Sequence, residues 1–165
     1  MVYLSLGSNL GDRFNFLQQG IDGLRDVAVD RQIQRSKIYE TEPWGNIAQP
    51  NFLNCVVEFD YRGTPEALLS EIHEIEAGTG RIRGSDSTVT QWMARTLDLD
   101  ILVFNDVCIN SEKLTIPHKL MTQRHFVLVP LAEIVPDLII PGYLKSVRQC
   151  VDECQDICGL KIWKQ

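Results

Sequence analysis

The order of apolar and polar residues predicts an interleaved series of strands and helices. Alternating or continuous apolar runs predict strands at residues 2–6, 33–39, 52–59 and 97–104, with a short return strand near 107–109. Apolar residues three and four positions apart predict helices at about 12–24, 65–77, 126–134 and from 146 onward. The triplet Gly7-Ser8-Asn9 should end the first strand, and the prolines at 43 and 50 exclude regular structure before the third.

The resulting order, β-α-β-β-α-β, favours one fold class. Strict alternation of strands and helices would indicate a parallel α/β sheet, but here two strands follow one another. The order matches a ferredoxin-like split β-α-β sandwich, an α+β fold in which a mostly antiparallel sheet is backed by helices. The sequence has no internal repeat and no obvious linker, so residues 1–165 are expected to form a single domain.

Composition and charge narrow the possible functions. The chain is 44% hydrophobic and 23% charged, as in ordinary soluble proteins, and its formal net charge of −6 argues against a general nucleic-acid binder. No apolar run reaches the roughly 18–20 residues needed to cross a bilayer. The N-terminal residues lack the basic start and apolar segment of a signal peptide. We therefore expect a cytoplasmic monomer with no nucleic-acid or membrane partner.

The five cysteines are expected to be free thiols, because their number is odd and no secretion signal accompanies them. Cys150, Cys154 and Cys158 recur every four residues and should line one face of the last helix. A metal site there would need Cys-x-x-Cys spacing or histidine partners, which are missing. Small apolar core residues are the favoured interpretation.

Asp98 and Asp100 interrupt the apolar run of the strand at 97–104. Side chains of a strand alternate between its faces, so the leucines at 97 and 99, Ile101 and Val103 should enter the core, while both aspartates share the other face, roughly 6.5–7 Å apart. Two such carboxylates repel each other, and a hard cation such as Mg²⁺ relieves the conflict. The alternative is the solvated side of an edge strand. The nearby Arg95 and Trp92 favour chemistry, because they offer a charge for phosphate and a flat surface for a ring.

The usual glycine-rich phosphate loops are missing, so any bound phosphate must be held by cationic side chains and metal. A second polar cluster contains His118, which follows a proline and could donate to a phosphate, and Arg124, which could add a bidentate fork. A capping or core histidine is the alternative for His118. Glu76, at a helix end, is either a ligand for a hydroxyl or cation or a solvated side chain.

A third cluster has the composition of a pocket for a flat heterocycle. Aromatic rings could sandwich such a ring while an amide reads its edge; equally, the aromatic residues could belong to the core. The members are Thr41, Pro43, Trp44, Phe52 and Asn54.

These motifs occur in a characteristic order. They are Ser5–Asn9, Gln49–Asn54, Glu74–Glu76 with Gly80-Arg81, Arg95–Ile101, Pro117-His118 and Arg124–Leu131. Together they resemble the 6-hydroxymethyl-7,8-dihydropterin pyrophosphokinase family of folate biosynthesis, over nearly the whole chain before the last helix. The resemblance implies that ATP donates a pyrophosphoryl group to the hydroxymethyl oxygen of the pterin and releases AMP. It also implies two Mg²⁺ ions, with Asp98 and Asp100 as their protein ligands.

The resemblance assigns the remaining candidate residues to three groups. Catalytic positions, partly on a loop that closes over the substrates, are Arg81, Arg83, Trp92 and Arg95. Positions for ATP and the transferred phosphates are Glu76, Lys113, His118 and Arg124. The pterin pocket is matched by Thr41, Pro43, Trp44, Phe52, Asn54 and Phe126.

The chain departs from the family pattern at a few positions. Lys113 replaces a usual arginine, Lys119 replaces an aromatic residue or proline, and the loop at 84–91 is longer than in compact members. These departures concern rate and ATP affinity more than the reaction. Two rival functions stay open: a ferredoxin-like ligand-binding or regulatory domain, which would release no AMP from ATP, and an RNA-binding sheet.

Overall fold

An antiparallel sheet with helices on both faces forms the centre of the molecule. The computed structural model describes residues 1–44, 48–80, 94–156 and 158–164. The strands are β1 (Val2–Ser8), β2 (Gln34–Arg35), β3 (Tyr39–Thr41), β4 (Phe52–Phe59), β5 (Asp98–Phe104), β6 (Ile109–Asn110), β7 (Thr115–Ile116) and β8 (Leu160–Ile162). The helices are α1 (Arg13–Val27), α2 (Pro65–Gly78), α3 (His125–Ile134) and α4 (Val147–Glu153), with 3₁₀ turns η1 (Val29–Arg31) and η2 (Met121–Gln123).

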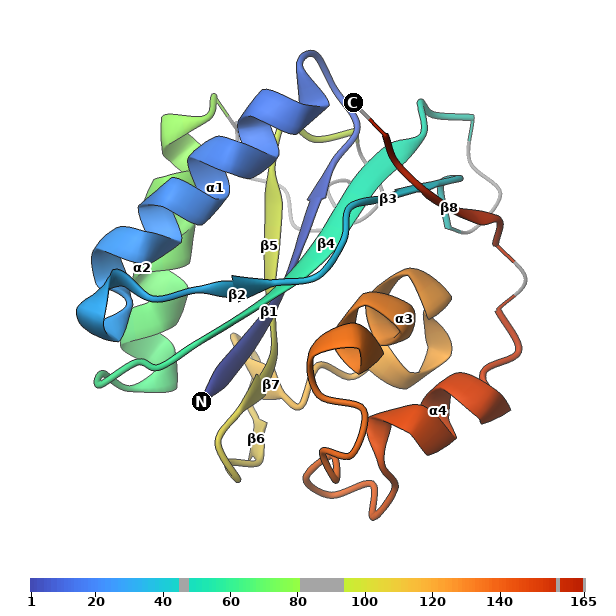
Figure 1. The fold of residues 1–165 in the computed structure, drawn as a ribbon. Coiled ribbons are helices and arrows are strands. Elements are labelled where there is room, and N and C mark those ends of the chain that lie inside the picture. Colours follow the sequence, from blue (N-terminus) through green and yellow to red (C-terminus); the bar gives the residue numbers. More distant parts are fainter. Residues whose placement is uncertain (45–47, 81–93, 157, 165) are drawn as a thin grey trace.

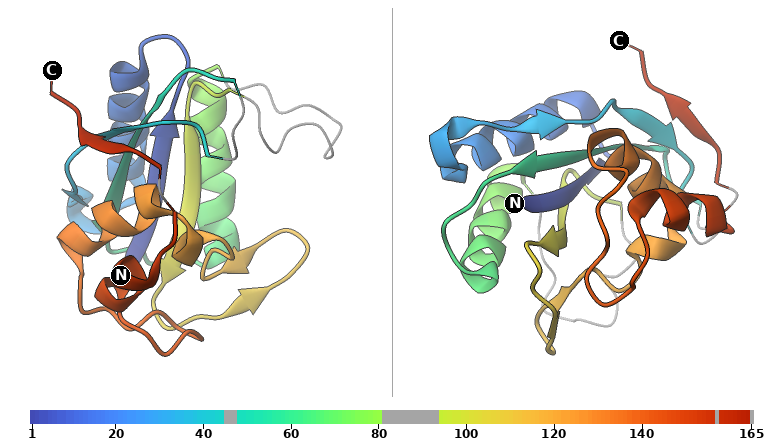
Figure 2. Two further views of the ribbon diagram at one scale, coloured as in Figure 1. Left: turned by 90° about the vertical axis from the view of Figure 1, so that its right-hand side faces the viewer. Right: turned by 60° about the horizontal axis from the view of Figure 1, so that its bottom comes forward.

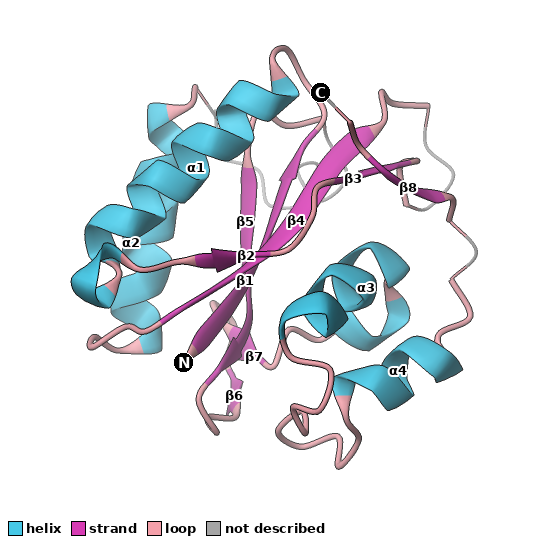
Figure 3. Cartoon of the chain, in the orientation of Figure 1, coloured by secondary structure: helices cyan, strands magenta, loops and turns pink. Residues whose placement is uncertain are grey.

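In the described part of the chain, the main sheet has the order β5-β1-β4-β3-β8, and β2 also pairs with β4. Every pairing in it is antiparallel. Helices α1 and α2 cover one face and α3, backed by α4, covers the other (Figure 1; Figure 2 gives two further views). The expected α+β sheet backed by helices is therefore confirmed, and Figure 3 shows the central strands between the two helical layers.

Each face of the sheet has its own hydrophobic core. Residues alternate along β1, so Leu4 and Leu6 pack with α1 and α2, whereas Tyr3 packs with α3. The fully buried Leu17, Leu24 and Leu68 belong to the first core; Leu128 belongs to the second. The core on the α3 face therefore supports any site that lies on this side of the sheet.

A β-bulge changes the expected phase of β5. Tyr3 pairs with Val103 and Leu4 with Ile101, which leaves Leu102 as an extra residue. Leu102 and Val103 therefore both enter the second core, and Phe104 returns to the first. Val103 is buried in a core, as predicted, but on the face of the aspartates and not on that of Leu99 and Ile101, because the bulge interrupts the alternation. Asp98 and Asp100 precede it and share one face, as predicted.

Capping residues set the predicted helix starts. The side chains of Asp12 and Thr64 accept hydrogen bonds from the third residue beyond them and begin α1 and α2, and Pro65 occupies the first helical position of α2. Ser146 begins α4 with a capping box. That helix ends at Glu153, so Cys154 and Cys158 lie beyond it, and the predicted helical stripe of three cysteines was wrong.

Three strand predictions also need correction. β1 continues through Gly7 and Ser8 instead of ending there. The predicted strand at 33–39 is two short strands, β2 and β3, that pair with different parts of β4. The predicted return strand near 107–109 is β6, which pairs with β7 in a separate hairpin.

None of the helices among the described residues combines the length and apolarity required to cross a membrane.

Candidate active site

A cavity of about 250 Å³ opens on the α3 face, where β1 ends and β4 and β5 begin. Most of the predicted site residues, which come from five separate segments, line it together. They are Thr41, Pro43, Trp44, Phe52, Asn54, Arg95, Asp98, Asp100, His118, Arg124 and Phe126. The structure thus brings together the aspartate pair, the His-Arg cluster and the aromatic cluster. We call this space the first cavity.

The aspartate pair lies at the inner wall of the first cavity. Asp98 pairs with Gly7 and Asp100 with Ser5 across the β1–β5 ladder, and all four line the cavity. Burial and the neighbouring charge of Asp98 raise the pKa of Asp100 to about 7, although Arg124 and Arg95 oppose the increase. Asp98 forms an ion pair with Arg95, and these two side chains are only 21% and 20% exposed. Asp98 and Asp100 therefore form a partly buried anionic site that a cation would stabilise.

Asn54 of β4 has a fixed side-chain orientation, and its partner on β1 is a glycine, which has no side chain. Its Nδ2 donates to Thr41 Oγ1 over 2.7 Å, and both side chains are buried. A Cβ placed on Gly7, its register partner, would lie 2.8 Å from Asn54 Oδ1. Glycine is therefore required at position 7 for close approach, which explains why a residue typical of turns continues a strand. The amide is presented to the cavity in a fixed orientation.

Aromatic rings and a guanidinium form the outer part of the first cavity. The Arg124 guanidinium lies 4.9 Å from the centre of the Trp44 ring and 5.6 Å from that of Phe126. Its Nε is buried and has no hydrogen-bond partner among the described residues. Burial lowers the pKa of Arg124, while the carboxylates of Asp100, Asp98 and Asp156 oppose that change.

His118 is neutral at physiological pH. Burial and the charge of Arg124 lower its pKa to about 4, despite the opposing charge of Asp98. Its Nδ1 accepts a hydrogen bond of 3.3 Å from the Leu120 amide, so the ring proton belongs on Nε2. Its own backbone amide donates to Leu102 O, at the β5 bulge, over 2.9 Å. His118 is thus a fixed neutral donor.

A second cavity of about 320 Å³ adjoins the first and shares five residues with it, including both aspartates. Glu76 and Lys113 line the second cavity only. Glu76 is 1% exposed and its Oε1 accepts from the Leu99 amide over 2.9 Å, which holds the free edge of β5 against α2. Lys119, at a position that departs from the family pattern, lines both cavities.

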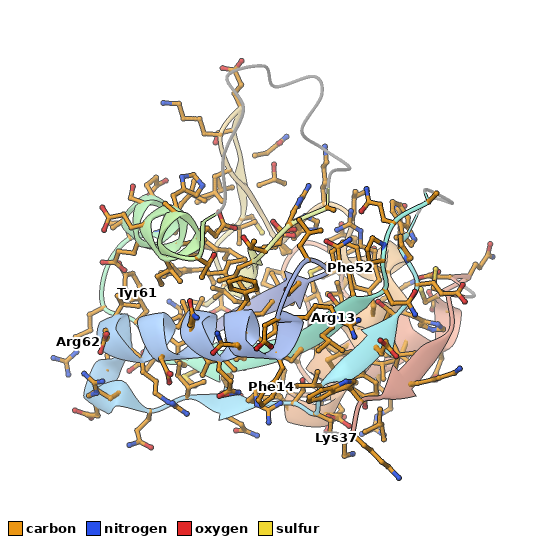
Figure 4. All side chains as sticks on the ribbon, turned by 90° about the horizontal axis from the view of Figure 1, so that it is seen from above. Arg13, Phe14, Lys37, Phe52, Tyr61 and Arg62 are labelled. Carbon is orange, nitrogen blue, oxygen red and sulfur yellow. The ribbon has the colours of Figure 1, made fainter. Side chains whose placement is uncertain are left out.

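Asn9, which was not among the predicted site residues, connects three segments of the site. Its Oδ1 accepts from the Arg95 amide over 2.7 Å, and its Nδ2 donates to Gln49 Oε1 and Pro50 O. Arg13 adds a second link, because its Nη1 donates to Glu40 Oε1 and Asn51 O, each over 2.8 Å; Arg13 and Phe52 are labelled in Figure 4. The sequence signal for Asn9 was its place at the end of the Ser5–Asn9 motif, which belongs to the family resemblance. The predicted residues Arg81, Arg83 and Trp92 lie outside the described residues.

Comparison with known proteins identifies a matching family. A model of the family "7,8-dihydro-6-hydroxymethylpterin-pyrophosphokinase (HPPK)" matches residues 3–136. The chain is 40% identical over 150 residues to the 2-amino-4-hydroxy-6-hydroxymethyldihydropteridine pyrophosphokinase of Methylorubrum extorquens, covering 91% of this chain and 90% of that protein. It is 38% identical over 165 residues to the pyrophosphokinase of the same name from Bacillus subtilis, covering 100% of this chain and 91% of that protein.

Solved structures show the same fold. A Plasmodium falciparum HPPK-DHPS triple mutant superposes with a TM-score of 0.70 at 16% sequence identity, covering 92% of this chain and 44% of that one. An HPPK-DHPS in complex with substrates gives a TM-score of 0.64 at 14% identity, covering 92% and 42%. The chain therefore spans less than half the length of these solved proteins, and at such low identity the likeness concerns the fold alone.

Proposed function

The chain belongs to the 7,8-dihydro-6-hydroxymethylpterin-pyrophosphokinase family, and we propose that it transfers pyrophosphate from ATP to the hydroxymethyl group of 6-hydroxymethyl-7,8-dihydropterin, giving AMP and the pterin diphosphate. It is thus a transferase of folate biosynthesis that uses ATP as its co-substrate. One observation supports this reaction above others. An aromatic cavity and a polar cavity meet at a shared pair of carboxylates, Asp98 and Asp100, beside Arg95 and His118.

The first cavity fits the pterin. Phe52 and Phe126 supply aromatic walls for a flat ring, and the fixed amide of Asn54 supplies hydrogen bonds for its edge. Trp44 and Arg124 close the outer side. A ring held there directs its hydroxymethyl group toward the aspartates, where the second cavity begins.

The aspartate pair fits Mg²⁺. Its donors are hard carboxylate oxygens, and burial together with the charge of Asp98 makes the Asp100 carboxylate favour a bound cation. Bound Mg²⁺ would neutralise charge on the ATP phosphates. No group of three or more His, Cys, Asp or Glu side chains that could hold a metal occurs within the described ranges, so phosphate oxygens and water are expected to complete the coordination. Two ions per site, as the family resemblance implies, remain a prediction.

The remaining polar residues act by position and charge. Arg95 offsets the negative charge that accumulates on the transferred pyrophosphoryl group and on AMP, and Arg124 binds the ATP phosphates. His118 donates Nε2–H to a phosphate oxygen without needing to change its protonation state. Lys113 and Lys119 add cations along the second cavity. Alignment of the two substrates supplies the rest of the rate enhancement.

The test is AMP formation from ATP and 6-hydroxymethyl-7,8-dihydropterin in the presence of Mg²⁺. We expect AMP only when both substrates are present, and a decrease of at least about 100-fold in kcat for D100A, because a carboxylate that supports the phosphates is lost. A protein that binds both ligands but forms no AMP would support the regulatory-domain alternative. Full activity of D100A with Mg²⁺ would contradict the metal assignment.

The RNA-binding alternative loses its physical basis. An RNA-binding sheet of this fold presents an open face with aromatic side chains. Here α1 and α2 cover one face and α3 covers the other (Figure 1). We also propose that residues 1–165 act as one domain, because β8, beyond the family match, pairs with β3 of the same sheet. A monomeric state stays a prediction, which light scattering would test.

A further inference from the structure

A segment beyond the family match reaches the candidate active site. After α4 the chain turns back past the start of α3 and pairs as β8 with β3, whose Thr41 lines the first cavity. At its end, the Trp163 amide donates to Ile38 O over 2.9 Å, and its ring stacks on Phe14 with centres 5.0 Å apart (Phe14 is labelled in Figure 4). The family model ends at residue 136, so this contact is made by a part of the chain to which the match assigns nothing.

Asp156 is the residue of this segment that contacts α3. Its Oδ2 accepts a hydrogen bond of 3.0 Å from the His125 amide, the first residue of the helix. Its Oδ1 accepts one of 3.1 Å from the Cys158 amide, which fixes the carboxylate from its other side. The local N-cap residue of α3 is Arg124, whose side chain makes no capping hydrogen bond. A carboxylate 31 positions away in the sequence therefore performs the task that Ser, Thr or Asp normally performs locally.

The first turn of α3 carries two residues of the first cavity. Arg124 immediately precedes the capped amide and Phe126 immediately follows it. Arg124 cannot cap its own helix, because a guanidinium has only hydrogen-bond donors and an N-cap must accept from a backbone amide; its side chain instead contacts the Trp44 and Phe126 rings. The charge of Asp156 also acts on this guanidinium. Loss of the carboxylate would leave the amide of the first turn without this partner and allow both side chains to shift.

From this arrangement we infer that Asp156 is a positioning residue for the pyrophosphoryl transfer: by capping α3 from outside, it fixes Arg124 against the phosphates and Phe126 against the pterin. This role rests on the proposed function. Asp156 touches neither substrate, so its effect is expected on binding of both substrates more than on the chemical step.

The test compares steady-state kinetics of the full-length wild type, D156A, D156N and D152A. Asp152 is an exposed carboxylate in the same part of the chain and serves as the matched control. We expect D156A to raise KM for the pterin and for ATP about fivefold, the effect of a lost helix cap, with kcat within about twofold of wild type. D156N keeps one oxygen that can accept from the His125 amide, so its KM values should lie between. D152A should match the wild type.

Hydrogen exchange separates positioning from general stability. The His125 amide should exchange faster in D156A, while amides in the middle of β4 remain protected. A folded D156A with wild-type KM values, or with a loss of Tm and no change in KM, would overturn the inference. If D156A does not fold, D156N decides: intermediate KM values with faster His125 exchange agree with positioning through the cap, and KM values equal to those of the wild type despite faster exchange contradict it. A wild type that forms no AMP would instead refute the proposed function.

Discussion

At the scale of single residues, the pterin half of the site depends on a missing side chain. Gly7 leaves room for Asn54 Oδ1, and this space allows the Asn54–Thr41 hydrogen bond to form. The composition of this half could be predicted from the sequence, because aromatic and amide residues cluster in it. The role of Gly7 could not, since a Gly-Ser-Asn triplet is equally typical of a turn and the requirement for close approach arises only from the partner strand.

Replacement of Gly7 by alanine should therefore weaken pterin binding. The new Cβ would force Asn54 to move and break its hydrogen bond to Thr41, and we expect KM for the pterin to rise about tenfold, since a buried hydrogen bond to substrate is worth about 1–1.5 kcal/mol. KM for ATP should change little. Steady-state kinetics check this result, with G78A as the control, because a Cβ at Gly78 meets nothing within 4 Å. Unchanged pterin KM in G7A would show that the Asn54 amide does not contact the pterin.

At the scale of elements, Glu133 of α3 ties this helix to the segment between β2 and β3. Its carboxylate accepts hydrogen bonds from Tyr39 Oη over 2.6 Å, and from the Lys37 amide and Lys37 Nζ, each over 2.8 Å. Burial alone would raise the pKa of Glu133, but these hydrogen bonds outweigh it and hold the pKa below its usual range. The link therefore depends on pH.

The variant E133Q should lower the free energy of unfolding by about 1 kcal/mol at pH 7, the value of a typical charge-assisted hydrogen bond. Because the pKa is lower in the folded state than in the unfolded chain, the stabilisation is complete above the ordinary glutamate pKa and disappears as the pH falls through the folded-state value. Denaturant unfolding of wild type and E133Q should thus converge below about pH 4. The exposed Lys145–Glu153 pair offers a control, and E153Q should change stability little. A pH-independent difference would contradict the role of the ionised carboxylate.

The sequence predicted elements well where the core imposes a periodicity and poorly where backbone pairing alone decides. The spans of β4 and α3 follow from apolar spacing, and that of α2 from apolar spacing and its cap, Thr64. β8 could not be predicted, because the three residues Leu160, Lys161 and Ile162 are too short a run for their alternation to indicate a strand, and they are ordered by their hydrogen bonds to β3. The cysteine spacing fits a helix, yet the backbone of Cys154 is extended and α4 ends before it. Periodicity permits a helix but does not set its length.

At the scale of the whole molecule, the sheet separates two cores that contribute differently to function. The core with α1 and α2 supports the back of the sheet, and the core with α3 supports the residues that surround the first cavity. Leu24 and Leu128 are both fully buried, one in each core. They allow the contribution of each core to be measured with the same substitution.

Both L24A and L128A should lower the free energy of unfolding by about 2–5 kcal/mol, as expected for a buried leucine replaced by alanine. Only L128A should also raise KM for the pterin, because it loosens α3 beneath Phe126, whereas L24A leaves that helix intact. Chemical denaturation and kinetics on the folded fraction provide the comparison. Equal KM values in the two variants would argue that the sheet transmits packing defects between its faces.

The bulge in β5 decides which single-residue deletions in this strand would keep Asp98 and Asp100 on their face. Loss of Leu102 would leave a regular ladder in which Asp98, Asp100 and Val103 keep their faces, whereas loss of Leu99 would reverse the face of Asp98. The carbonyl of Leu102, however, accepts the His118 amide. An in-frame deletion of codon 102 should therefore keep both aspartates on their face and displace the histidine, while the loss of a buried leucine from the second core lowers the stability. The extra residue is not needed for the β1–β5 ladder, but its side chain fills the second core and its carbonyl accepts from the loop that follows.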